Sequence, residues 1–217
     1  TRMNINKHLI LLFSVLFFLF AVSVSSGCFR KNESDVKSVV RNELDQLKNL
    51  DSETTQKYIP YTELFPDATE NTDLTDEINE TFSLFFRKFN YKISDVIVGT
   101  ANHSATVSVK LTTIDSKVLA RDFKAELLRT QITESAQAQK GNIKDSSRSL
   151  EAHYLILNHL LNTNDYDTAE TDCNIQLVNT GNDKKEKWKI QRTNSLEDDL
   201  VGGLIADLAN PDILSPE

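Results

Sequence analysis

The sequence predicts an α+β domain in which helices pack on a curved antiparallel sheet of about four strands. Apolar residues recur at helical spacing in some segments and alternate with polar residues in others. The segments follow the order helix, helix, two strands, two helices, two strands, helix. Because the strands come in consecutive pairs, each pair is expected to form an antiparallel hairpin. The 217 residues suffice for one such domain and an N-terminal leader.

The first helix is predicted from about Asp35 to Leu50. Ser34 is a suitable N-cap residue, because its hydroxyl can accept a hydrogen bond from a backbone N–H of the first turn. The apolar residues that follow share one helical face: Val36, Val39, Val40, Leu44 and Leu47. A short helical piece is predicted over residues 52–59, and the prolines of residues 60–73 predict an irregular loop.

A stripe of large apolar residues predicts that the next helix packs into the core. Asp73 or Thr75 is expected to cap this helix at its N-terminus. The stripe consists of Leu74, Ile78, Phe82, Phe86 and Phe89, with Phe85 beside it. Phenylalanines at this spacing are far more often core residues than the wall of a ligand site.

Two segments with a period of two predict the hairpins. Residues 91–98 and 105–111 flank a turn, and the second strand places alternate apolar residues on one face: Ala105, Val107, Val109 and Leu111. Residues 167–180 and 187–193 flank a second turn, with Trp188 and Ile190 expected to face inward.

Between the hairpins, residues 116–138 and 150–161 predict two long helices joined as a helical hairpin. A terminal helix over residues 195–208 carries an apolar face of Leu196, Leu200, Val201, Leu204, Ile205 and Leu208. Gly202 and Gly203 weaken that helix by about 1 kcal/mol each, so a bend or a close packing contact is expected there.

Residues 1–27 are predicted to be a lipoprotein signal peptide. Arg2 and Lys7 supply a positive end, and Leu9 to Val24 form an apolar run of about 16 residues, short of the roughly 20 that a spanning helix needs. Residues 28–34 are predicted as a polar tether, residues 35–210 as a single α+β domain and residues 211–217 as a tail.

Ser25-Ser26-Gly27-Cys28 resembles a bacterial lipobox, in which small residues precede a cysteine that is diacylated and becomes the mature N-terminus. The resemblance implies lipidation at Cys28. Two acyl chains anchor stably where one holds only marginally. Ser25 departs from the pattern, since a branched aliphatic residue is usual there, so ordinary cleavage near Ser23 to Ser26 and an uncleaved anchor stay open.

The charge of the chain argues against nucleic acid as a partner. Removing residues 1–27, which hold Arg2 and Lys7 and no acid, changes the formal net charge from −8 to −10. A mature chain this acidic is repelled by phosphate backbones. The membrane, reached through the lipid anchor, is the partner that the sequence predicts.

No motif predicts catalytic, cofactor-binding or metal-binding residues. His153 and His159 are six residues apart on one helix and so face different ways, as ordinary surface or boundary histidines do. His103 is expected in a solvated turn. The acidic run of residues 165–172 lacks the central glycine of a calcium loop and is interpreted as an acid-rich connection between a helix and a strand.

Cys173 and Asp95 were the remaining candidates for chemistry. The alternating segment around Cys173 predicts a buried, inert thiol, because nothing nearby supplies an activating base. Asp95 lies in the first predicted strand, where a single aspartate is more often an edge or bulge residue than a general base.

The leader, the amphipathic first helix, the hairpins and the ending from Glu186 to Leu208 are similar to small uncharacterised lipoproteins of Gram-positive bacteria. Those lipoproteins are related to the nuclear transport factor 2-like, cystatin-like superfamily. The resemblance implies a helix packed into a curved antiparallel sheet and carries over no catalytic residue. In some members the sheet encloses a pocket, where an acid such as Asp95 would act as a base.

The sequence therefore predicts a lipid-anchored binding or interaction protein on the extracytoplasmic face of the cell membrane, with an unknown ligand. One alternative is an enzyme with a pocket in the concave face of the sheet. Another is an assembly role in which the terminal amphipathic helix docks a second protein.

Overall fold

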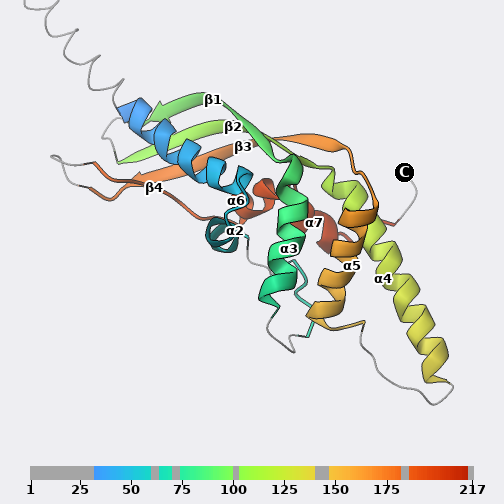
Figure 1. The fold of residues 1–217 in the computed structure, drawn as a ribbon. Coiled ribbons are helices and arrows are strands. Elements are labelled where there is room, and N and C mark those ends of the chain that lie inside the picture. Colours follow the sequence, from blue (N-terminus) through green and yellow to red (C-terminus); the bar gives the residue numbers. More distant parts are fainter. Residues whose placement is uncertain are drawn as a thin grey trace, which may run out of the picture.

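The computed structural model describes residues 32–59, 64–69, 74–99, 103–139, 147–181 and 186–214, and it confirms the α+β class. Figure 1 shows the sheet along one side of the molecule with the helices gathered against it. The predicted leader, Cys28 and the first part of the tether lie outside the described residues. Among the helices of the described part, none is both long and apolar enough to cross a membrane.

The sheet has four antiparallel strands in the order β1-β2-β3-β4, the two predicted hairpins side by side. The strands are β1 (Asn90–Val98), β2 (Ser104–Ile114), β3 (Thr168–Asn179) and β4 (Trp188–Ile190). Strand β1 is an edge strand, and its register shifts between Ile93 and Asp95. The two central strands are the longest, so they carry most of the sheet's contribution to the core.

The predicted alternation holds along the central strands. Ala105, Val107, Val109 and Leu111 of β2 are buried. On β3, Cys173, Ile175 and Leu177 are buried, and Val107 and Val109 pair with Ile175 and Cys173 in the ladder. Because successive side chains point to opposite faces, this pattern gives the sheet one apolar face and one polar face.

The first described helix covers residues 32–48, so it begins earlier than the sequence predicted. Ser34 lies inside the helix, and the N-cap prediction for it is wrong. Val36, Val40, Leu44 and Leu47 are buried as predicted. Two contacts fasten this helix to β1: Tyr91 Oη donates to Asp45 Oδ1 (2.6 Å), and Lys48 Nζ donates to Asn90 Oδ1 (2.9 Å).

Helix α2 (Ser52–Tyr58) leads to α3 (Thr75–Phe85) and a short 3₁₀ turn, η1 (Phe86–Lys88). The predicted aromatic stripe is core: Phe82, Phe85, Phe86 and Phe89 are all buried. The capping prediction for α3 is wrong for Thr75, because Leu74 occupies the N-cap position without a side-chain cap bond. Asp73, the other predicted cap, lies outside the described residues. Leu74 is itself buried, so apolar packing decides where this helix begins.

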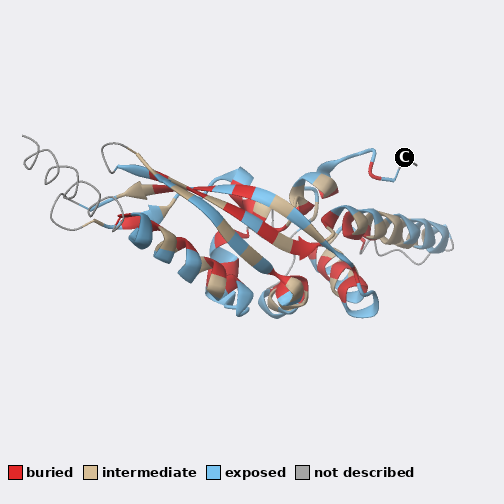
Figure 2. Cartoon of the chain, turned by 90° about the horizontal axis from the view of Figure 1, so that it is seen from above, coloured by how far each residue is buried: buried red, intermediate tan, exposed pale blue. Residues whose placement is uncertain are grey.

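Helices α4 (Ser116–Ala138) and α5 (Leu150–Thr163) form the predicted pair, capped by Asp115 and Ser149. The buried residues of α4 all lie in its first half: Ser116, Leu119, Ala120 and Phe123. Its second half projects from the body and shows no buried surface in Figure 2.

The predicted terminal helix is split into α6 (Asn194–Leu200) and α7 (Leu204–Ala209). Gly202 and Gly203 both take positive φ values, 65° and 88°, which an α-helix cannot contain. The expected bend is therefore a complete break. The predicted tail also contributes to the core, because Ile213 is buried.

Candidate functional site

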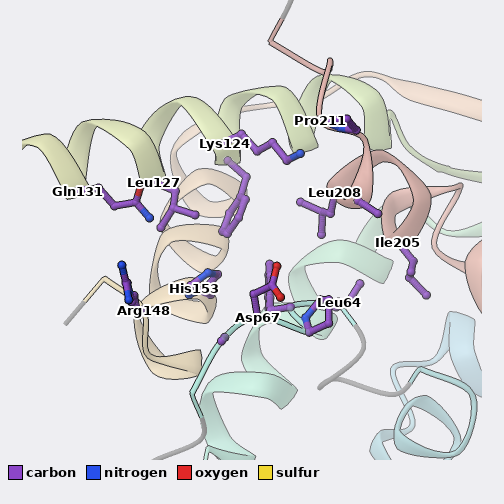
Figure 3. A pocket seen from close by; sticks show the side chains of 15 residues that line it. Leu64, Asp67, Lys124, Leu127, Gln131, Arg148, His153, Ile205, Leu208 and Pro211 are labelled. Atoms are coloured by element: carbon purple, nitrogen blue, oxygen red, sulfur yellow. The ribbon is translucent and has the colours of Figure 1, made fainter. Parts of the chain in front are cut away.

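A cavity of about 840 Å³ lies among α4, α5, α7 and residues 64–69. Figure 3 shows side chains from all four segments converging on it. The lining residues are Leu64, Phe65, Pro66, Asp67, Ala68, Phe123, Lys124, Leu127, Gln131, Arg148, His153, Ile205, Leu208, Ala209 and Pro211. The volume falls within the roughly 300–1,000 Å³ typical of small-molecule sites.

Aromatic rings form one wall of the cavity. The rings of Phe65 and Phe123 stack with centroids 5.0 Å apart, and the His153 ring lies 5.0 Å from Phe65 and 5.7 Å from Phe123. Tyr154 packs edge-on against Phe65 from the buried side. These contacts pack the rings against one another, so they form a continuous aromatic surface on this side of the cavity.

A short parallel bridge fixes residues 64–69 against the start of α5. Thr69 N donates to Arg148 O, and Leu150 N donates to Thr69 O, each at 2.9 Å. The hydroxyl of Ser149 accepts a hydrogen bond from Ala152 N and caps the helix at the same place. The loop that carries Phe65 and Asp67 is therefore tied to the helix that carries His153.

Helix α7, which also forms part of the cavity wall, is positioned by polar contacts on either side of Gly202 and Gly203. Ser116 Oγ donates to Gly202 O (2.5 Å) and lies 2.8 Å from Asp207 Oδ2. Asp198 Oδ1 accepts hydrogen bonds from Ile205 N (2.9 Å) and Ala206 N (3.2 Å), the free donors at the start of α7. These contacts position α7 so that Ile205 and Leu208 line the cavity, and Leu208 points into the space in Figure 3.

His153 has a defined tautomer when it is neutral. Its Nδ1 lies 2.8 Å from Ser149 O. Because a carbonyl oxygen only accepts, Nδ1 carries the proton and Nε2 is left as a hydrogen-bond acceptor. Burial lowers the pKa of His153 below its ordinary value, and the hydrogen bond to Ser149 opposes that shift. The cavity wall thus presents an uncharged ring at neutral pH.

Two cations and one carboxylate also line the cavity: Lys124, Arg148 and Asp67. Lys124 is half-buried and its Nζ donates to Asn210 O at 2.5 Å. Asp67 is exposed on the 64–69 segment and points into the space in Figure 3. The cavity therefore joins an apolar wall to a charged rim, to which Lys124 contributes a half-buried cation.

The structure places the histidines and Asp95 as the conservative interpretations predicted. His159 and His103 are exposed, and His153 is half-buried. Asp95 is exposed beside the register shift of edge strand β1, and its carboxylate accepts a hydrogen bond from Val96 N (2.9 Å). It is a bulge residue and does not line the cavity.

Cys173 is a buried free cysteine, as predicted. Burial raises the pKa of its thiol to about 12, and the charge of Asp199 and a hydrogen bond to it add to the shift. Burial also raises the pKa of Asp199, although the Cys173 thiol opposes that shift. A thiol with this pKa is neutral at physiological pH and is a poor nucleophile.

The acidic clusters have structural roles. Asp165 forms an ion pair with Lys88 at 2.6 Å, and Lys110 lies between Glu170 (3.4 Å) and Asp172 (3.6 Å). Within the described ranges, no three histidine, cysteine or acidic side chains are grouped so that they could hold a metal ion.

Leu200, Leu204 and Leu208 are buried in the protein's own core. Their burial removes the motive for predicting that the terminal helix docks a second protein. The cavity itself was not predicted, because its walls come from four segments that are far apart in the sequence. The one local signal was that Leu127 continues the apolar stripe of Leu119 and Phe123 along α4 past its buried half.

Comparisons with family models, curated proteins and solved structures gave no match to this chain. The resemblance to cystatin-like lipoproteins therefore stays a prediction, and the geometry of the cavity is the main guide to function.

Proposed function

We propose that this protein is a lipid-anchored binding protein that holds a small ligand at the extracytoplasmic face of the cell membrane. The proposal that the protein binds a small ligand is supported by the cavity among α4, α5, α7 and residues 64–69. It combines an aromatic wall with a few polar side chains, the usual composition of a small-molecule site. The lipobox-like sequence before Cys28 supports the anchor.

The binding part is tested with a neutral apolar fluorophore, N-phenyl-1-naphthylamine, and two neighbouring substitutions on α4. Leu127→Trp places an indole in the cavity, whereas Leu128→Trp places the same indole on the exposed side of the helix, where Leu128 is 48% exposed. We expect the wild type and Leu128→Trp to bind the probe equally, and Leu127→Trp to bind it at least about tenfold more weakly.

Thermal melts of both variants establish that each is folded before binding is compared. Equal probe affinity in the two tryptophan variants would show that the probe binds elsewhere and would overturn the cavity as the binding site.

The anchor is tested by expressing the full chain in a bacterium and measuring the mass of its mature N-terminal peptide. We expect a peptide that starts at Cys28 and carries a diacylglyceryl group. In detergent phase partition, the wild type should enter the detergent phase and the processed Cys28→Ser chain should not. An unmodified Cys28, or a mature chain that starts elsewhere, contradicts the anchor without affecting the cavity.

A further inference from the structure

We propose that the ligand of the cavity is a small amphiphile with an apolar body and one carboxylate group, and that Lys124 binds the carboxylate. This inference rests on the proposed binding function and adds the chemical class of the ligand.

Lys124 places a positive charge beside the apolar wall of the cavity, although the whole chain has a formal net charge of −8. Electrostatic interactions are stronger next to low-dielectric walls than in bulk water. A half-buried cation in this position favours an anionic ligand.

Lys124 is the lysine that lines the cavity, and its contact differs from those of two lysines that pair with carboxylates. Lys57 pairs with Glu43 at 2.9 Å, and Lys88 pairs with Asp165 at 2.6 Å. Lys124 has only the carbonyl oxygen of Asn210 among the described groups. An ammonium group has three N–H donors, so two donors of this half-buried cation are open to a ligand.

The surroundings of Lys124 select a ligand with an apolar body. Leu127, one turn after Lys124 on α4, and Phe123, the residue before it, line the same cavity. Leu208 lines the cavity from α7. Figure 3 shows the Lys124 side chain reaching across the space toward Leu208 and Pro211. A carboxylate bound to Lys124 would therefore have its hydrocarbon portion in contact with the aromatic and aliphatic wall.

A single carboxylate fits better than a more highly charged group. Asp67 lies on the opposite side of the cavity from Lys124 in Figure 3 and would repel additional negative charge. A bound monoanion also gains a charge-assisted hydrogen bond from Lys124, which is stronger than a bond between neutral groups.

The test compares three ten-carbon probes by isothermal titration calorimetry on the full chain, below their micellar concentrations: decanoate, decanol and decyltrimethylammonium. Decanoate should bind about tenfold more tightly than decanol, because hydrogen bonds to charged groups contribute more than neutral ones. Decyltrimethylammonium should bind most weakly. The preference for decanoate should shrink as salt is added.

Three substitutions locate the effect. Lys124→Met should remove the preference for decanoate over decanol. Asp67→Asn should tighten decanoate binding about two- to threefold by removing a nearby negative charge. Lys189→Met, at an exposed lysine on β4, makes the same change in net charge as Lys124→Met and should leave both affinities unchanged.

The outcomes separate this inference from the binding function on which it rests. Equal affinity for decanoate and decanol, or an unchanged preference in Lys124→Met, overturns the carboxylate inference while a cavity that binds neutral probes still stands. If decanoate, decanol and the neutral fluorophore all fail to bind, the binding function falls as well.

Discussion

A Cβ atom on Gly202 would lie 2.2 Å from Thr113 Oγ1, so the turn between α6 and α7 is pressed directly against the end of strand β2. No real Cβ approaches another atom this closely. Gly202 also takes a φ of +65°, a conformation that residues with a side chain rarely adopt. Close contact and backbone conformation both require glycine at this position, and together they set the direction of α7 toward the cavity.

Gly202→Ala should lower the free energy of unfolding by about 2–4 kcal/mol, the combined effect of a left-handed backbone and an overpacked contact. Gly203→Ala is the matched control. Its φ is +88°, but its nearest neighbours are Ser116 Oγ at 3.8 Å and Asp207 Oδ2 at 3.9 Å. Gly203→Ala should therefore lower the free energy of unfolding by about 1–2 kcal/mol, through backbone strain alone. Urea denaturation measures both values.

Thr113→Ala tests the contact itself. If the clash with Thr113 causes most of the destabilisation by Gly202→Ala, removing the Thr113 hydroxyl should relieve it. The double variant Gly202→Ala/Thr113→Ala should then lose less free energy of unfolding than the two single variants lose in sum. Simple additivity would show that the contact is unimportant.

Arg192→Met should lower the free energy of unfolding by about 1–3 kcal/mol, because it leaves a charged group without its partner. Glu197 is buried at 3% exposure, and its carboxylate pairs with the Arg192 guanidinium. Arg129→Met is the control, since Arg129 pairs with Glu126 on an exposed part of α4 and such pairs contribute little. Equal losses in the two variants would show that the burial of Glu197 has no energetic consequence.

The stability of the protein should fall on the acid side of neutrality through His153. Burial lowers the pKa of His153 in the folded state. Between that lowered pKa and the ordinary value near 6.5, the unfolded chain binds more protons than the folded chain. The free energy of unfolding therefore decreases as pH falls through this window.

His153→Phe keeps a ring beside Phe65 and Phe123 and removes the titrating group. Urea denaturation between pH 7.5 and 5 should show a smaller acid-side loss in this variant than in the wild type. His159→Phe, at an exposed residue of the same helix, is the control. A wild-type loss no larger than that of His153→Phe would contradict the assignment.

Cys173 should not react with thiol reagents while the protein is folded. Its thiol is buried, and its pKa is raised to about 12 by burial and by Asp199. In the Cys28→Ser chain, where Cys173 is the only cysteine, a colorimetric thiol assay should detect no thiol in native buffer and one in concentrated urea. Rapid labelling of the native chain would mean that the segment around Cys173 opens readily.

The sequence correctly predicted those helices and strands whose buried face can be identified from the spacing of apolar residues within one segment. The alternation of Ala105, Val107, Val109 and Leu111 identified the central strand, and the phenylalanine stripe identified the core face of α3. Gly202 and Gly203 marked the place where the terminal helix ends. The period of a strand or a helix decides which residues of a segment lie on the same face. The spacing of apolar residues in the sequence is therefore enough to identify the buried face.

Where tertiary packing competes with local preference, the predictions failed. Leu74 begins α3 although Thr75 has the better capping side chain, because Leu74 is buried there. No pattern in the sequence predicted that Glu197 is buried and paired with Arg192. Neither outcome follows from neighbouring residues, since burial depends on what other segments cover.

By itself, the sequence determined the α+β class, the alternation of helical segments with pairs of strands, and the inward faces of the central strands. Only the tertiary structure decided that residues 64–69, α4, α5 and α7 meet around a cavity with Lys124 inside it. The physical reason is the range of the interactions. Secondary structure follows from hydrogen bonds and periodicity within a few residues, whereas a cavity is the space left when segments distant along the chain pack against one another.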